Sequence, residues 1–246
     1  MIIKIKLKGQ ISFSDFDNQI RINNLNQVQI ENHDPLSINA YESFNEIING
    51  LKDNNQYEDN TFYGNRALFN DPFNKYKYTF LNTPDREKKL KLEIKWFRPS
   101  EINSIDLIHS QNTIRDAIIN PHAIDNRQGQ LGNCWLIASI SLLANKRDFL
   151  ENIFMTSLIP QYKCRKYGCY PLKLCINGIW SIITIDDRLP CLPDKTLRYS
   201  KTYKNQLYSS FIEKALAKVN KNYESLEAGS FPEGINKLCF FLIFIE

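Results

Sequence analysis

The clearest hydrophobic pattern in the chain is a run of ten mostly apolar residues at 135–144, which contains neither glycine nor proline. A run of this length and composition predicts a buried helix. The polar, glycine-containing segment 128–133 comes directly before it, and such a segment is typical of a loop that leads into a helix. Cys134 is therefore expected on the first turn of that helix.

Other segments repeat their apolar residues with a helical or a strand period. Apolar residues recur at helical spacing in 148–155 and in 205–223, which predicts two amphipathic helices. Two runs typical of β-strands, 170–176 and 179–185, are joined by an Asn-Gly pair at 177–178, a strong signal for a β-hairpin. Helices interleaved with a hairpin predict an α+β fold.

The N-terminal quarter has a different texture, because it is rich in Asn and poor in long apolar runs. Short alternating patterns predict strands at 3–8 and 10–16, and a candidate helix lies around 41–51. We expect residues 1–60 to form an N-terminal extension or a small β-containing region. Residues 64–246 are expected to form the main domain.

Two shorter patterns complete the picture. Residues 94–97 read as a short strand anchored by Trp96, which Pro99 breaks before a helix capped by Ser100. The apolar run 238–245 is expected to be a last core strand or an aggregation-prone segment. It is much shorter than the ~20 residues of a membrane-spanning helix, so no membrane span is expected.

Composition narrows the class of protein. The 246 residues are 43% hydrophobic and 24% charged, as in soluble globular proteins. The net charge of +4 is too small and dispersed to argue for nucleic-acid binding. The N-terminus lacks the apolar core of a signal peptide, so we expect an intracellular, cytoplasmic protein with six free cysteines. Cys164, Cys169 and Cys175 cluster without a nearby histidine, which leaves zinc as a minor alternative.

The candidate chemistry centres on Cys134. The unpaired N–H groups and the dipole at a helix N-terminus stabilise a thiolate, the nucleophilic form of cysteine. Gln128 lies six positions earlier, where its amide and the Cys134 backbone N–H would form a two-donor cradle for an oxyanion. The alternative is a buried structural cysteine on a core helix.

Three segments carry a resemblance to a known family. The segment Gln-Gly-x-Leu-Gly-x-Cys-Trp at 128–135 resembles the catalytic-cysteine segment of the calpain family of cysteine endopeptidases, although that family usually has Asp in place of Asn133. Lys-Trp-x-Arg-Pro-x-Glu at 95–101 and Glu-Lys-Ala-Leu-Ala-Lys at 213–218 are similar to family segments in the same order. The resemblance implies a papain-like, calpain-type fold, of which this chain holds the first, cysteine-bearing subdomain. It also implies protein substrates.

The general base of such an enzyme is missing from the sequence. A thiolate protease needs a histidine and a group that orients it, but His33, His109 and His122 all precede Cys134. In the family the histidine and asparagine belong to a second subdomain, so we treat His109 and His122 as structural or surface residues. The chain is expected to be the nucleophile half of an endopeptidase and inactive alone. The alternative is a protease-like module that binds a protein partner without cleaving it.

The resemblance also implies a calcium site, because calpains are calcium-activated. One acidic ligand corresponds to Asp125, and the other corresponds to Gln206, where the family has Glu; backbone carbonyls near Ile118 and Asn120 would complete the set. Calcium takes 6–8 oxygen ligands, including charged carboxylates. Since Gln206 removes one charge, we expect weak calcium binding at best. Nothing in the sequence indicates an organic cofactor.

Overall fold

A computed structural model describes residues 33–52, 55–70, 94–103, 117–118, 120–203 and 206–239. Its helices are α1 (Pro35–Gly50), α2 (Asn65–Leu68), α4 (Cys134–Ala144), α5 (Arg147–Ile153), α6 (Gln161–Tyr167), α7 (Tyr208–Val219) and α8 (Phe231–Cys239). Its strands are β1 (Lys95–Phe97), β2 (Asn126–Arg127), β3 (Cys169–Ile176), β4 (Ile179–Asp186), β5 (Leu189–Cys191) and β6 (Lys201–Thr202). The strands pair antiparallel as β1–β5, β2–β6 and β3–β4.

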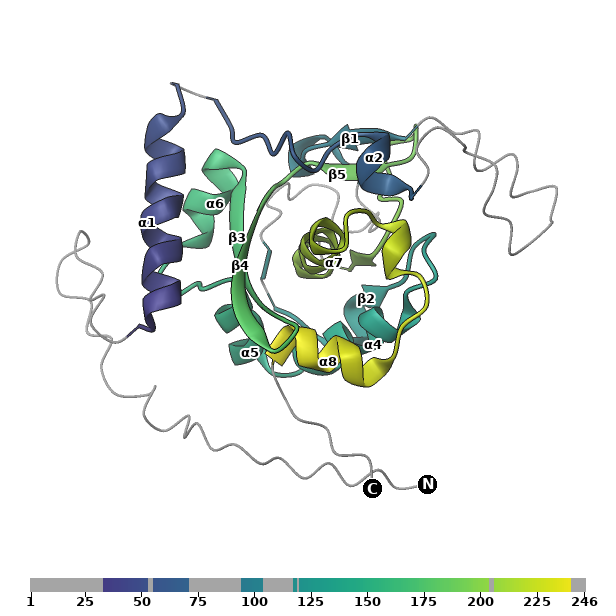
Figure 1. The fold of residues 1–246 in the computed structure, drawn as a ribbon. Coiled ribbons are helices and arrows are strands. Elements are labelled where there is room, and N and C mark those ends of the chain that lie inside the picture. The colour runs from purple at the N-terminus through teal and green to yellow at the C-terminus, as the bar shows by residue number, and fades with distance from the viewer. Residues whose placement is uncertain are drawn as a thin grey trace, which may run out of the picture.

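The β3–β4 hairpin is the long sheet element predicted from the sequence. Its register runs from Cys169 opposite Asp186 to Ile176 opposite Ile179. Asn177 and Gly178 both have positive φ, 52° and 81°, as a two-residue type I′ turn requires. Helix α1 lies along one side of the hairpin and α7 along the other (Figure 1). Because both faces are covered, nearly every β3 side chain is buried, including those that point away from the main core.

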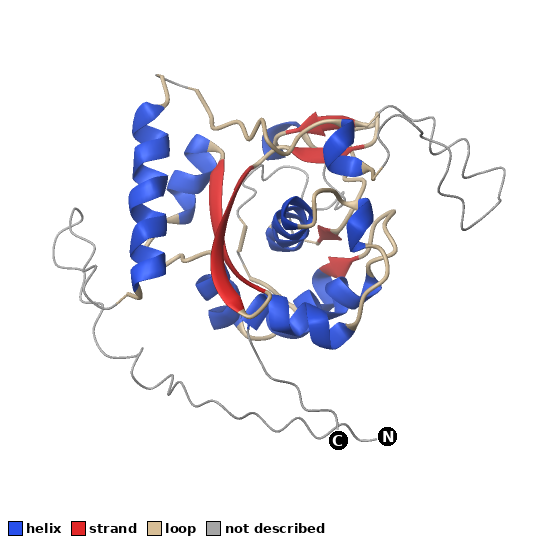
Figure 2. Cartoon of the chain, in the orientation of Figure 1, coloured by secondary structure: helices blue, strands red, loops and turns tan. Residues whose placement is uncertain are grey.

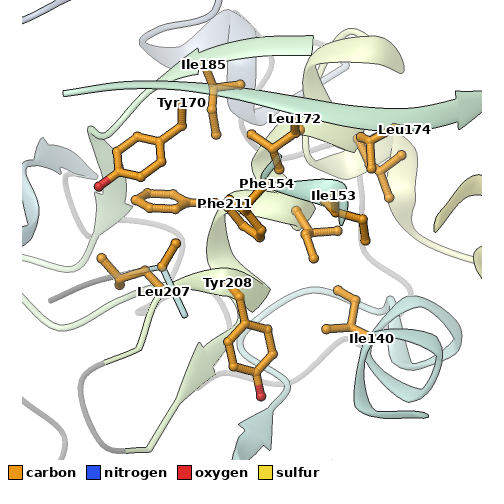
Figure 3. Packing of buried hydrophobic residues seen from close by; sticks show 14 of the residues in the cluster. Ile140, Ile153, Phe154, Tyr170, Leu172, Leu174, Ile185, Leu207, Tyr208 and Phe211 are labelled. Carbon is orange, nitrogen blue, oxygen red and sulfur yellow. The ribbon is translucent and has the colours of Figure 1, made fainter. Parts of the chain in front are cut away.

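The hydrophobic core lies between the hairpin and α7. Tyr170 and Leu172 of β3 point toward Phe211 of α7 and Phe154 after α5 (Figure 3). Figure 2 shows α7 nearly end-on, with the hairpin on one side and α4 and α8 on another. Every residue of α7 from Tyr208 to Ala217 is buried, so the predicted amphipathic helix is in fact a central one. It begins three residues later than the sequence pattern suggested.

Helix α4 confirms the prediction for 135–144, and it packs against α8. Gly234 of α8 is required there, because a Cβ at this position would lie 2.3 Å from the Ser139 Oγ of α4. The prediction of a last strand was wrong for its first two residues, because Leu238 and Cys239 belong to α8. The rest of that run and the strands predicted at 3–8 and 10–16 lie outside the described residues.

Two predicted helix starts also needed correction. Helix α1 begins at Pro35 and not near residue 41, because Asp34 caps it by accepting a hydrogen bond from the Ser37 backbone N–H at 3.2 Å. After β1 there is only a 3-10 turn, Pro99–Glu101, capped at Arg98 and not at Ser100. Proline suits the first helical position because its missing N–H would have no partner there. None of the helices in the described ranges has the length and apolar character needed to cross a membrane.

Candidate active site

Cys134 is the first residue of α4, and its side chain is exposed at the protein surface. Cys164, Cys169, Cys175 and Cys191 are buried as free thiols. Burial raises the pKa of the Cys164 thiol to about 12. The described residues contain no group of three or more His, Cys, Asp or Glu side chains that could hold a metal.

The loop before Cys134 lies against the segment that contains β6. Gln130 donates its backbone N–H to the Arg198 carbonyl at 2.9 Å. A Cβ on Gly129 would lie 2.2 Å from the Tyr199 carbonyl oxygen, so only glycine allows this approach. Strand β2 pairs with β6 directly before the loop, so the loop is fixed by its backbone on both sides.

Gln128 is exposed in this loop, and its side-chain amide donates to the Leu131 carbonyl. None of the hydrogen bonds found among the described residues joins Gln128 to Cys134. The amide braces the turn that leads into α4, and its expected role toward an oxyanion stays a prediction.

Asn133 links the nucleophile to the central helix. Its Nδ2 donates to Glu213 Oε1 of α7 at 2.6 Å, and Glu213 Oε2 accepts the Ser200 backbone N–H at 2.9 Å. Asn133 and Glu213 are 0% and 1% exposed, and burial raises the pKa of the Glu213 carboxyl. Sequence reasoning noticed Asn133 only as a departure from the family pattern and Glu213 only as part of a family-like segment, so it missed this positioning pair.

Trp135 anchors the first turn of α4 on the side away from the loop. Its indole N–H donates to the Leu226 carbonyl at 2.9 Å. A Cβ on Gly229 would lie 2.4 Å from the ring, so the chain that leads into α8 lies directly on the indole. Cys134 therefore sits between two residues whose side chains are locked.

Asp186 and Asp187, at the end of the hairpin, form ion pairs. Lys214 of α7 is fully buried, and its ammonium group donates to an Asp186 carboxylate oxygen, to the Asp186 carbonyl at 2.9 Å and to the Arg188 carbonyl at 2.5 Å. Arg188 also pairs with Asp186 at 2.6 Å, and Arg98 pairs with Asp187. Burial lowers the pKa of Lys214, although Asp186 opposes the shift. These charges support the core and are not exposed to a substrate.

The residues implied as calcium ligands are engaged with one another or with other protein groups. Gln206 Oε1 accepts the Asn120 backbone N–H at 2.9 Å, and Gln206 Nε2 donates to the Asn120 carbonyl at 3.1 Å. Gln161 makes the same pair of bonds to the N–H and C=O of Ile118, both at 3.0 Å. Asp125 is buried at the end of a 3-10 turn, Ala123–Asp125. Since amide N–H donors face both carbonyls, this arrangement does not fit a calcium ligand set.

The histidines within the described ranges have structural roles. His122 is exposed and caps the 3-10 turn Ala123–Asp125, where its Nδ1 accepts the Ile124 backbone N–H at 3.4 Å. His33 precedes α1, and partial burial lowers its pKa. His109 lies outside the described residues.

Comparison with known proteins gives the family. The model of the calpain family of cysteine proteases matches residues 57–242. Calpain-type cysteine protease ADL1 of Oryza sativa is 32% identical over 171 residues, which are 69% of this chain and 7% of that protein. Calpain-A of Drosophila melanogaster is 30% identical over 72% of this chain and 20% of its own length. The calpain-1 catalytic subunit of Macaca fascicularis is 33% identical over 57% of this chain and 18% of its own length.

The chain thus spans no more than about a fifth of the length of these relatives. The matched region contains the α4 helix with Cys134, the hairpin and α7. Its mixture of helices and small sheets is the α+β, papain-like arrangement of the protease core. The chain belongs to the calpain family of cysteine proteases.

Proposed function

We propose that this chain carries the nucleophile half of an intracellular, cytoplasmic cysteine endopeptidase that acts on proteins. The observation that supports this most directly is the exposed Cys134 thiol at the N-terminus of a buried helix, directly after a residue locked to α7. The thiolate would attack a peptide carbonyl, expelling the amine and forming an acyl-enzyme that water hydrolyses. The Cys134 backbone N–H and the Gln128 amide are proposed as oxyanion donors.

The proposal includes a general base from outside the described part of this chain. His122 is used as a turn cap, and a histidine with its orienting asparagine would come from a second subdomain. Without them, oxyanion stabilisation and binding alone leave a rate lower by orders of magnitude. We therefore propose that the chain alone does not turn over peptides. We also propose that any calcium binding through Asp125 and Gln206 is weak at best, because the Gln206 amide is already engaged by the Asn120 N–H and C=O.

A second candidate is a non-catalytic module that binds a protein partner. Cys134, Ala138 and Leu142 recur every four residues on α4 and are all exposed, Leu142 by 46%. This spacing places them on one helix face, where a partner could cover apolar surface. Under the first proposal the same face would receive a second protease subdomain.

Thiol labelling tests the assignment of Cys134 as the nucleophile. Limited iodoacetamide labelling near neutral pH with peptide mapping should modify Cys134 faster than the half-buried Cys239. A peptide epoxide probe should then prefer Cys134, while a Cys239→Ser variant serves as the matched control. Faster labelling of Cys164 or Cys191 would remove Cys134 as the nucleophile. Casein hydrolysis by the pure chain, abolished in Cys134→Ala, would contradict the need for a second subdomain.

A further inference from the structure

Two glutamine side chains hold the short segment that contains Ile118 and Asn120. Each glutamine engages both the N–H and the C=O of one residue, Gln161 at Ile118 and Gln206 at Asn120, with all four distances between 2.9 and 3.1 Å. Paired strands exchange two hydrogen bonds between opposed residues in the same way. Each glutamine amide therefore pairs with one backbone residue as a residue of an adjacent β-strand would.

The two glutamines come from elements far away in sequence. Gln161 is the first residue of α6, and Gln206 lies two residues before α7 and is 1% exposed. The Ala117 carbonyl accepts the backbone N–H of Tyr208 at 2.9 Å and of Leu207 at 3.3 Å. This carbonyl thus satisfies N–H groups that a helix start leaves without an intrahelical partner. The segment is consequently joined to the beginnings of two helices.

We propose that Gln161 and Gln206 take the place of a bound metal ion. Their hydrogen bonds hold the backbone that precedes the nucleophile loop without calcium. A neutral amide supplies both donor and acceptor positions, so it satisfies the backbone N–H and C=O of one residue without adding charge. A cation would instead need bare oxygens directed at it, including carboxylates that offset its desolvation. The four hydrogen bonds already use the carbonyls that calcium would require.

The two glutamines and the segment that they hold, here called the clamp, lie close in sequence to the candidate active site. Ile118 and Asn120 precede the turn Ala123–Asp125 and strand β2, which leads directly into the loop before Cys134. The clamp fixes where this stretch begins, and the β2–β6 pairing fixes where it ends. Gln161 and Gln206 are therefore positioning residues. This inference concerns the shape of the loop and holds whether or not the chain is part of an active protease.

The decisive variant is Gln206→Glu. A carboxylate cannot donate to the Asn120 carbonyl, so the bond from Nε2 is replaced by repulsion between two oxygens. That arrangement is relieved when a cation binds between them. We expect the full-length variant to have a lower melting temperature than the wild type in EGTA, and to recover part of the loss in calcium at the ~10⁻³ M level of weak protein sites.

The wild type should show the same melting temperature, and the same protease cleavage pattern across residues 117–127, in EGTA and in calcium. Gln206→Ala should lose on the order of 5 °C in both, because it leaves two peptide groups unpaired. Gln161→Ala, at a half-buried position, should lose less, so it tests the clamp if Gln206→Ala does not fold. Gln56→Ala is the matched control, since Gln56 makes one exposed contact at 3.4 Å.

Two results would overturn the inference. One is calcium raising the melting temperature of the wild type as much as that of Gln206→Glu. The other is Gln161→Ala and Gln206→Ala both matching Gln56→Ala in melting temperature and cleavage pattern. Neither readout depends on proteolytic activity, so a failure of Cys134 labelling would refute the proposed function and leave the clamp untouched.

Discussion

Replacing Asn133 by aspartate should make the stability of this protein strongly dependent on pH. The side chain is fully buried, with Nδ2 lying 2.6 Å from Glu213 Oε1. An aspartate would place a second carboxyl group against the first. Two unit charges about 4 Å apart repel by about 4 kcal/mol at an effective dielectric constant of about 20, so the folded pair should retain one proton.

The size of the effect follows from that proton. Above roughly pH 5 the unfolded chain has released it, whereas the folded variant still holds it, so stability falls as pH rises. One retained proton corresponds to about 1.4 kcal/mol per pH unit. From pH 5 to pH 7, the stability of Asn133→Asp should therefore fall by about 3 kcal/mol. The wild type has a weaker trend of the same sign, because burial already raises the pKa of Glu213.

Urea unfolding followed by tryptophan fluorescence at pH 5, 6 and 7 measures this loss. The control is the double variant Asn133→Asp, Glu213→Gln, which restores one amide facing one carboxylate with the roles exchanged. The amide oxygen introduced at position 213 can still accept the Ser200 backbone N–H. Parallel pH profiles for Asn133→Asp and wild type would refute the reasoning, as would an equally steep profile for the double variant.

Two other substitutions test the packing around the site. Lys214→Met should destabilise the protein by about 3–5 kcal/mol, because it leaves the buried Asp186 carboxylate without its closest cation. Chemical denaturation measures this loss of stability. A loss below about 1 kcal/mol would show that the ion pair contributes little. Gly129→Ala should displace the loop and change the iodoacetamide labelling rate of the nucleophile, since the new Cβ meets the Tyr199 carbonyl. Gly132→Ala is its control, because the nearest atom there is 3.9 Å away, and equal rates in the two variants would contradict the explanation.

Local signals were sufficient to predict the elements that carry Cys134 and the hairpin. The run 135–144 has one interpretation because it is long and apolar, and the Asn-Gly pair allows a tight turn that few other residues permit. The family resemblance depended on the same loop. The central position of α7 was not visible, because the charged residues Glu213 and Lys214 interrupt its apolar pattern, and only their distant partners explain their burial.

Other elements could not be predicted because tertiary contacts form them. Helix α8 contains Gly234, a poor helix former, and it is stabilised by its approach to α4. Helix α6 is short and polar, but Pro160 before it and Gly168 at its end, with φ 63°, were boundary signals that sequence reasoning overlooked. The partners of Gln161 and Gln206 lie 43 and 86 residues away, beyond any local pattern.

The ion pairs around Asp186 also have a consequence for the order in which the chain assembles. An unpaired ammonium is costly to desolvate. Helix α7 therefore cannot bury Lys214 in the core until Asp186 of β4 is in place to pair with it. We infer that the hairpin and α7 dock in one cooperative step. The segment around Asp59 joins the same group from 127 residues away, where its N–H donates to Asp186 Oδ2 at 2.8 Å. Closing so long a loop is entropically slow, so this segment should be the last to settle when the protein folds.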